Sequence, residues 1–495
     1  MNKHRYIEKM CVIAGSLYCL LFLIASLSRL LYPYELEWNE GAVLDHAIRI
    51  LEGKQLYAPP SLDFAAFVYT PFYYVVVALI IKFGGIGLWA GRLVSILATL
   101  SAAYIIGAIV HRETKSTFLA SVSAMLYLAF YHATGFFFDI VRMDALALLF
   151  AIASIFTALY VKRGHLLAAG LLALAFFTKQ QMIVFWPAIV LWLTLRNWRE
   201  ALTFSAISAT CIACGTIVMN VTTHQWYGFY TLTIPSVKAG LLFSLSDALR
   251  FLPTGIFGEF AITTIVIVLG VALWGARSWL KRDAILLLYF CYLCALAGAC
   301  LSLGNSGGYK NVLMPFSAII AVLFPLSAQR LSHLIQPVQS QIALAPWLLL
   351  FEFASLAYNP FGQIALFGSA KQRAGGDQFV ETIRALPGDT WIPFHGYLNR
   401  MAGKPTHIHF MAMNDVLLVQ DTNTIRFRRE IDRAYASHHF ATIVLDENKV
   451  YPLGEIPDYS FSKNILATPN VLLSRIGDAP TRPQFLFIPS TSSHK

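Results

Sequence analysis

Long apolar runs separated by short polar segments cover most of the first 357 residues. A hydrocarbon core about 30 Å thick needs about 20 apolar residues per helix, and fewer where a helix is buried in a bundle. By this measure eleven runs are predicted to cross a membrane, near residues 10–31, 88–110, 118–138, 145–161, 166–178, 182–195, 201–220, 258–276, 284–303, 311–328 and 341–357. A further apolar run covers residues 64–83.

The basic clusters indicate whether residues 64–83 cross the membrane, because cytoplasmic loops carry an excess of Lys and Arg. If this run does not span, every cluster lies on the cytoplasmic side; if it spans, the later clusters move outside. We therefore predict that residues 64–83 lie in the interface or dip into the bundle, with Pro71 and nearby tyrosines at headgroup depth. The basic clusters are Lys3/Arg5/Lys9, Arg112/Lys115, Lys162/Arg163, Arg196/Arg199, Arg277/Lys281/Arg282 and Arg330.

The chain changes character at residue 359, after which Pro, Gly, charged and His residues occur throughout. Residues 378–386 are predicted to form an amphipathic helix, and residues 391–394 and 441–445 short strands. His395, His407 and His409 could be metal ligands, but they lack tight ligand spacing and are interpreted as scattered surface residues.

Composition supports the same architecture. Hydrophobic residues make up 57% of the 495 positions and charged residues 13%, against about 25% charged in a soluble chain, and the mean hydropathy is +0.60. We expect an all-α polytopic membrane domain with juxtamembrane helices at residues 1–358, its first outer loop at 32–87, and a small α/β domain at 359–495. The expected location is a cell membrane, with a bacterial inner membrane favoured, the N-terminus cytoplasmic and the C-terminal domain outside.

The net charge of +10 does not indicate nucleic-acid binding, because the basic residues form short clusters between apolar runs rather than a stripe. The seven cysteines all lie within apolar runs, so no disulfide framework is predicted.

Candidate chemistry begins in the first outer loop, where Glu35, Glu37 and Glu40 place three carboxylates within six residues. Crowded carboxylates have raised pKa values and suit a general base or a cation site. A solvated loop that merely obeys the charge rule is an equally good interpretation.

Three other polar features lie on the same predicted side. Asp139, Arg142 and Asp144 occupy a turn between two apolar runs, where ionisable groups are costly and usually functional, although snorkelling at a helix end is the alternative. Lys179 separates two short runs and would need an anionic partner. Lys310 lies in a glycine-rich segment that could hold a phosphate, although such segments are often only turns.

Six features follow one another along the chain: Glu37 to Glu40, an amphipathic stretch ending in Gly53, Tyr69-Thr70-Pro71, Arg92-Leu93, Asp144 and Thr178-Lys179. In the order and spacing of these features the chain resembles the class C fold glycosyltransferases, which take sugars from polyprenyl phosphate carriers and include protein O-mannosyltransferases and lipid A aminoarabinose transferases. The resemblance covers roughly residues 10–330. The family often has an Asp-Glu pair in the first loop, whereas this chain has Asn39-Glu40, with Glu37 two residues before Asn39.

The resemblance implies sugar transfer from a polyprenyl-phosphate donor to an acceptor on the outer face, with inversion. A carboxylate would take the acceptor proton, and cations would stabilise the leaving phosphate. The candidate catalytic residues are Glu40, slightly favoured as the base, then Glu37, and Asp144 in support. The candidate substrate-binding residues are Arg142, Lys179, Lys310, Tyr69 and Asp139.

The alternative is a transporter or flippase of lipid-linked sugars, which would also need many spans and intramembrane charges. Polar groups gather on the outer side, however, and Glu352 is one of few near the midplane. No metal ligands and no certain cofactor are predicted, but a divalent cation, Mg²⁺ or Mn²⁺, between the carboxylates and the phosphate is left open. The expected partners are a polyprenyl-phosphate sugar, a lipid- or glycan-type acceptor and membrane lipids, and not nucleic acid.

Overall fold

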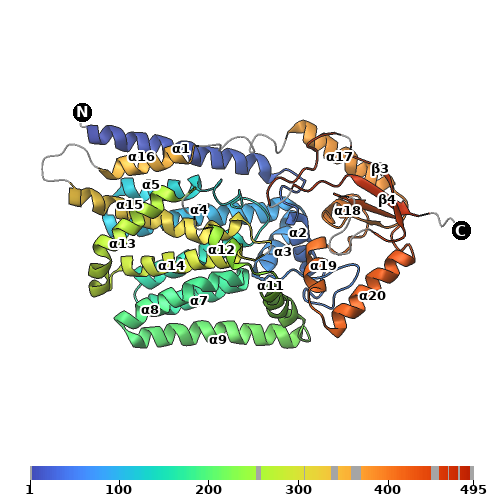
Figure 1. Cartoon of the computed structure of the whole chain (residues 1–495), viewed down its shortest axis with the longest axis horizontal. Helices are drawn as coiled ribbons and strands as arrows, with labels where there is room; N and C mark the ends of the chain where they lie inside the picture. The colour runs from blue at the N-terminus through green and yellow to red at the C-terminus, as the bar shows by residue number, and fades with distance from the viewer. Residues whose placement is uncertain are drawn as a thin grey trace.

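The structure is a computed structural model of the chain. It describes residues 3–251, 253, 258–305, 307–335, 344–357, 369–447, 456–466, 468–477 and 480–490. Figure 1 shows a bundle of roughly parallel long helices, with the start of α1 at one end, and a smaller mixed domain that contains β4 at the other end.

The bundle helices correspond one to one to the predicted spans in the described part of the chain. Six of them are long and apolar enough to cross a membrane by themselves, and the others are shorter. The prediction of a polytopic helical membrane domain is confirmed. The helices are α1 (Lys3–Leu30), α4 (Leu88–Thr114), α5 (Thr117–Ala129), α6 (Asp144–Tyr160), α7 (Gly164–Thr178), α8 (Trp186–Arg196), α9 (Trp198–Thr222), α13 (Ala261–Lys281), α14 (Ala284–Leu303), α15 (Met314–Ile335) and α16 (Leu344–Ser355).

One predicted span is too long. The run at residues 118–138 was expected to be helical throughout, but α5 ends at Ala129 and residues 130–143 form a loop. Gly135 and Phe136 both have positive φ, at 71° and 66°, a left-handed conformation that keeps helical winding from continuing through this run. Hydropathy could not reveal this loop because Phe136–Phe138 are as apolar as a helix interior.

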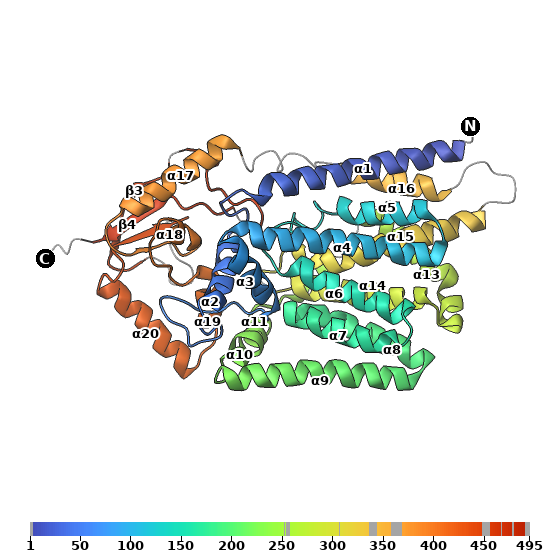
Figure 2. The ribbon, with the colours of Figure 1, turned by 180° about the vertical axis from the view of Figure 1, so that it is seen from behind.

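Two short helices, α2 (Glu40–Leu51) and α3 (Phe72–Gly84), lie between the bundle and the smaller domain in both views (Figures 1 and 2). The place of α3 beside α2, outside the row of bundle helices, agrees with a juxtamembrane helix at residues 64–83. Shorter segments join the later helices: η1 (Gln180–Phe185), α10 (Trp226–Gly228), η2 (Phe229–Thr233), α11 (Ile234–Leu242), α12 (Leu245–Phe251) and η4 (Lys310–Leu313).

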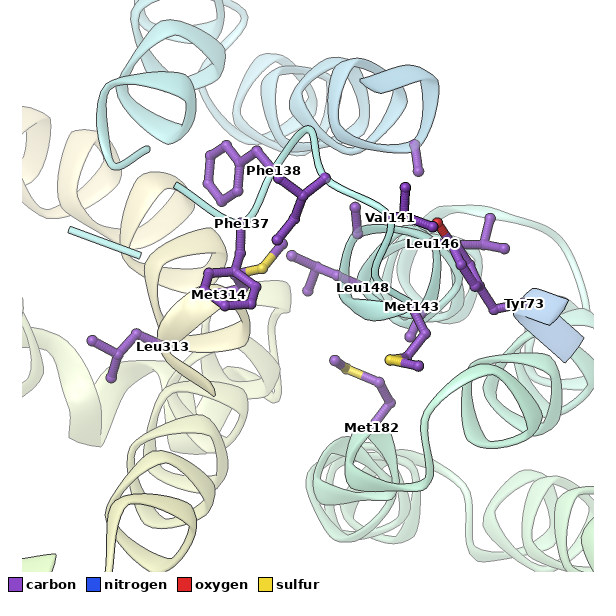
Figure 3. Packing of buried hydrophobic residues seen from close by; sticks show 14 of the residues in the cluster. Tyr73, Phe137, Phe138, Val141, Met143, Leu146, Leu148, Met182, Leu313 and Met314 are labelled. Atoms are coloured by element: carbon purple, nitrogen blue, oxygen red, sulfur yellow. The ribbon is translucent and has the colours of Figure 1, made fainter. Parts of the chain in front are cut away.

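Apolar packing fixes the loop at residues 130–143 against the helices around it. Figure 3 shows Met143, from this loop, and Met182, from η1, pointing toward one another, with Phe137 beside Met314 of α15. All four side chains are buried. This packing holds the loop, η1 and the start of α15 around the first turn of α6.

The smaller domain, called the tail domain here, contains a four-stranded sheet in the order β1-β2-β4-β3, with β1 parallel to β2 and the other pairs antiparallel. The predicted α/β character is confirmed, although its first helix begins eight residues earlier than residue 378, at a Ser369 capping box. The predicted domain boundary at residues 358/359 lies outside the described residues. The tail elements are α17 (Ala370–Ala385), α18 (Tyr397–Met401), α19 (Phe410–Leu417), α20 (Thr422–Ala436), β1 (Thr390–Trp391), β2 (Thr442–Leu445), β3 (Tyr459–Asn464) and β4 (Phe485–Pro489).

Candidate active site

The three acidic residues after α1 lie where the bundle meets the tail domain. Glu35, Glu37 and Glu40 are 7%, 2% and 0% exposed, so the alternative of a solvated loop is wrong. We call residues 31–40 the acidic loop. Buried carboxylates need partners, and those partners differ among the three residues.

Glu40, at the start of α2, forms a bidentate ion pair with Arg92 of α4, at 3.0 Å to Nε and 2.8 Å to Nη2. It also accepts hydrogen bonds from the backbone N–H groups of Leu36, at 2.6 Å, and Val141, at 2.8 Å. Both carboxylate oxygens are therefore fully engaged. This geometry joins the acidic loop to the bundle and leaves Glu40 poorly suited to accept a proton.

Glu37 has weaker partners. Its carboxylate accepts hydrogen bonds from the side-chain amide of Asn39, at 2.7 Å, and the Asn39 backbone N–H, at 3.1 Å, while the guanidinium of Arg142 is 3.5 Å away. Burial raises the pKa of Glu37 to about 7, against the opposing effects of Arg142 and Asn39. A carboxylate that titrates near neutral pH is suited to general base catalysis.

Arg142 lies at the end of the loop that packs on α6. Its guanidinium is 3.2 Å from the phenol oxygen of Tyr69 and lies over the rings of Tyr69 and Phe137, at 5.6 and 5.8 Å. The Arg142 Nε is buried and has no hydrogen-bond partner within the described part of the chain. This cation therefore retains a free donor for an anionic group.

Lys179 has the anionic partner that its position requires. Its ammonium lies 2.5 Å from an Asp144 oxygen, which also accepts a hydrogen bond from the Asn311 side chain at 2.8 Å. The other Asp144 oxygen is buried without a hydrogen-bond partner among the described residues. The Lys179 ammonium is 6.0 Å from the Tyr69 ring, so both cations flank Tyr69.

These side chains come from the acidic loop, the segments that precede α3 and α6, the first residue of α6, the end of α7 and η4. All are buried or half-buried. We call this group the reaction cluster: Glu37, Tyr69, Arg142, Asp144, Lys179 and Asn311.

Besides Glu40, two other sequence candidates lie outside the reaction cluster's contacts. Asp139 accepts a hydrogen bond from Tyr131 at 2.6 Å and lies 3.6 Å from Arg29, on the side of Glu40. Lys310 pairs with Glu259 at 2.8 Å through a side chain that is 42% exposed, against 7% for Lys179. Lys179 is thus the buried cation of the two lysines, and Lys310 is the exposed one.

The histidines of the tail domain are a correction to the sequence interpretation. His395, His407 and His409 were interpreted as surface residues, but all three are buried. His395 bridges Glu35 and Asp446, partners 360 and 51 positions away, so local spacing carries no signal for it. In the described ranges no group of three or more His, Cys, Asp or Glu side chains could hold a metal ion, and a bridging divalent cation stays a prediction.

Comparisons with known proteins place this geometry in context. Residues 67–303 match the model of Glycosyltransferase family 87. ArnT from Cupriavidus metallidurans bound to undecaprenyl phosphate aligns with a TM-score of 0.57 and 10% identity over 97% of this chain and 98% of that one. The apo crystal structure of ArnT gives 0.53 and 13% over 95% and 97%. The archaeal oligosaccharyltransferase AglB from Archaeoglobus fulgidus gives 0.48 and 10% over 86% and 69%. No curated protein sequence matches.

Proposed function

We propose that this chain, a membrane glycosyltransferase of the class C fold, transfers a sugar from a polyprenyl-phosphate donor to a hydroxyl acceptor with inversion. The expected resemblance to this fold class is confirmed by the alignment with ArnT over nearly the whole chain, and the match to Glycosyltransferase family 87 supports the enzyme class. The single observation that carries the proposal is the reaction cluster, in which a buried carboxylate faces a buried cation.

The reaction cluster offers a base and no obvious general acid, which suits a phosphate leaving group. The acceptor oxygen would attack the anomeric carbon as the bond from that carbon to the phosphate oxygen breaks. The acceptor proton would pass to Glu37. The polyprenyl phosphate leaves as an anion, so Arg142 and Lys179 would stabilise its charge without donating a proton.

Asp144 has a supporting role in this scheme. Its pairing with Lys179 and Asn311 would hold the ammonium in place before the donor binds, which reduces the reorganisation required during the reaction. The lipid-linked donor is proposed because ArnT binds undecaprenyl phosphate and because the exposed apolar side chains of the bundle suit contact with an isoprenoid chain.

The test measures where the sugar and the polyprenyl phosphate of a labelled donor go. Protein in lipid vesicles is given one sugar linked either to a polyprenyl phosphate or to a nucleoside diphosphate, with membrane lipids and glycans as acceptors. We expect labelled sugar on an acceptor and free polyprenyl phosphate from the lipid donor alone, with a strong loss in Arg142→Gln. Movement of the intact donor across the bilayer without release of polyprenyl phosphate would instead identify a flippase.

A further inference from the structure

One buried side chain of the tail domain makes ionic contacts on both sides. The Nδ1 of His395 lies 2.5 Å from Glu35 of the acidic loop, and its Nε2 lies 3.0 Å from Asp446, directly after β2. Burial alone would lower the pKa of His395, but the carboxylates of Asp446 and Glu35 raise it to about 10. Because each ring nitrogen faces a carboxylate oxygen, the ring is assigned as an imidazolium that donates from both nitrogens.

Glu35 links this imidazolium to the segment that carries Glu37. Its second carboxylate oxygen accepts a hydrogen bond from the backbone N–H of Gly41, in the first turn of α2, at 2.9 Å. The approach is close: a Cβ on Gly41 would lie 2.1 Å from that oxygen. Glu35 and Gly41 thus brace the two ends of residues 36–40, with Glu37 between them.

The tail domain makes a second contact with the same segment. The backbone N–H of Ile476 and the hydroxyl of Ser474 both donate to the carbonyl of Leu36, each at 3.3 Å, and Glu37 and Ile476 form a parallel β-bridge. These contacts with residues 36 and 37 come from the tail domain, in addition to the bundle contacts of Glu40 and Glu37. The tail domain therefore shapes the backbone at Leu36 and Glu37, while Arg92 of the bundle holds the preceding stretch by donating to the carbonyls of residues 29, 32 and 34.

We propose that His395 is a positioning residue for sugar transfer, through which the tail domain holds the carboxylate of Glu37 in its reactive orientation. The inference rests on the proposed function. Breaking a buried ionic network by removing one member leaves the other charges uncompensated, so loss of the imidazolium would leave two buried carboxylates that repel each other. Glu35 would then move, and the segment 36–40 would move with it.

The chain offers a matched control at the same domain junction. Arg400 of α18 pairs with Asp45 of α2 at 3.0 Å, which also joins the tail domain to the juxtamembrane helices. Asp45 lies beyond residues 36–40. Replacing Arg400 therefore removes an ionic contact between the domains without touching that segment. A general loosening of the tail would affect both variants, whereas positioning through His395 would affect only one.

The experiment compares His395→Gln with Arg400→Gln in the full chain, by two independent readouts. The first is hydrogen exchange of the backbone amides of residues 36–41, which we expect to speed up by about tenfold or more in His395→Gln only. The second is the kinetics of transfer, in which we expect kcat to fall by about tenfold with donor KM within about twofold. Glu35→Gln should have the same effect, and the double variant should lose no more than the worse single variant, because both act through one contact.

The outcomes separate this inference from the proposed function. Exchange and kcat both at wild-type values in a folded His395→Gln protein would overturn it, and so would faster exchange with unchanged kcat, which would indicate a purely structural contact. Equal losses of kcat in Arg400→Gln would also overturn it. Should the wild-type protein transfer no sugar, the proposed function fails, and hydrogen exchange alone then decides whether His395 holds the acidic loop. If His395→Gln does not fold, Asp446→Asn provides the same test with the imidazole retained.

Discussion

Glu37 and Glu40 lie three residues apart on one loop, are buried to nearly the same degree, and have different surroundings. The two oxygens of Glu40 form a bidentate ion pair with Arg92 and accept hydrogen bonds from two backbone N–H groups. Glu37 accepts from the side-chain amide and the backbone N–H of Asn39, and its arginine lies at the edge of hydrogen-bond distance. A fully engaged carboxylate stabilises structure, whereas a partly engaged one can still change its protonation state, so satisfaction of hydrogen bonds separates the two roles better than burial does.

The largest expected effect is on the reaction itself. Glu37→Gln keeps the volume and most hydrogen bonding but removes basicity, so we expect the transfer rate to fall about a hundredfold to ten-thousandfold. Donor binding and thermal stability should stay close to those of the wild-type protein. A purified Glu37→Gln protein that transfers sugar at the wild-type rate would show that Glu37 is not the base.

The matching change at the other carboxylate should affect the fold instead. Glu40→Gln leaves Arg92 buried without its counter-ion, and breaking such a pair costs about 3–5 kcal/mol. We expect a clearly lower Tm in detergent and less folded protein, with the folded fraction still active. A Glu40→Gln protein as stable as wild type but inactive would show that Glu40 is the base.

Sequence reasoning succeeded where the determinant was local. The spans followed from run length and apolarity, and the need of Lys179 for an anionic partner followed from its position between two short runs. The sequence could not decide between Glu37 and Glu40 as the base. The surroundings of Glu40 depend on Arg92, 52 positions away, and on the Val141 amide, in a loop that hydropathy predicted as helix. His395 was missed for the same reason, since both of its partners are distant in sequence.

A smaller effect is expected on donor affinity. Lys179→Ala removes a buried cation, and a hydrogen bond to a charged group is worth about 1.5–3 kcal/mol, so donor Kd should rise about tenfold to a hundredfold. Lys310→Ala removes a cation that is 42% exposed. Exposed ion pairs contribute about 0–1 kcal/mol, so this change should alter donor Kd by less than about fivefold. Equal losses in the two variants, measured by binding of a labelled donor, would place the phosphate between both lysines.

A change of pH should have a graded effect, small near neutral pH. Burial raises the pKa of Glu37 to about 7, and the base must be deprotonated to act. The value of kcat/KM should therefore increase as pH rises through about 7 and level off above it, falling about tenfold for each pH unit below that value. The residual activity of Glu37→Gln should lack this inflection. An unchanged inflection in that variant would assign it to another group.

The most direct test of the account is the position of a bound donor phosphate, measured by electron cryo-microscopy of the protein with a polyprenyl phosphate. We predict phosphate density between Arg142 and Lys179, with Glu37 facing the side from which an acceptor would approach. Density at Lys310 and Glu259, or beside Arg92 and Glu40, would contradict it.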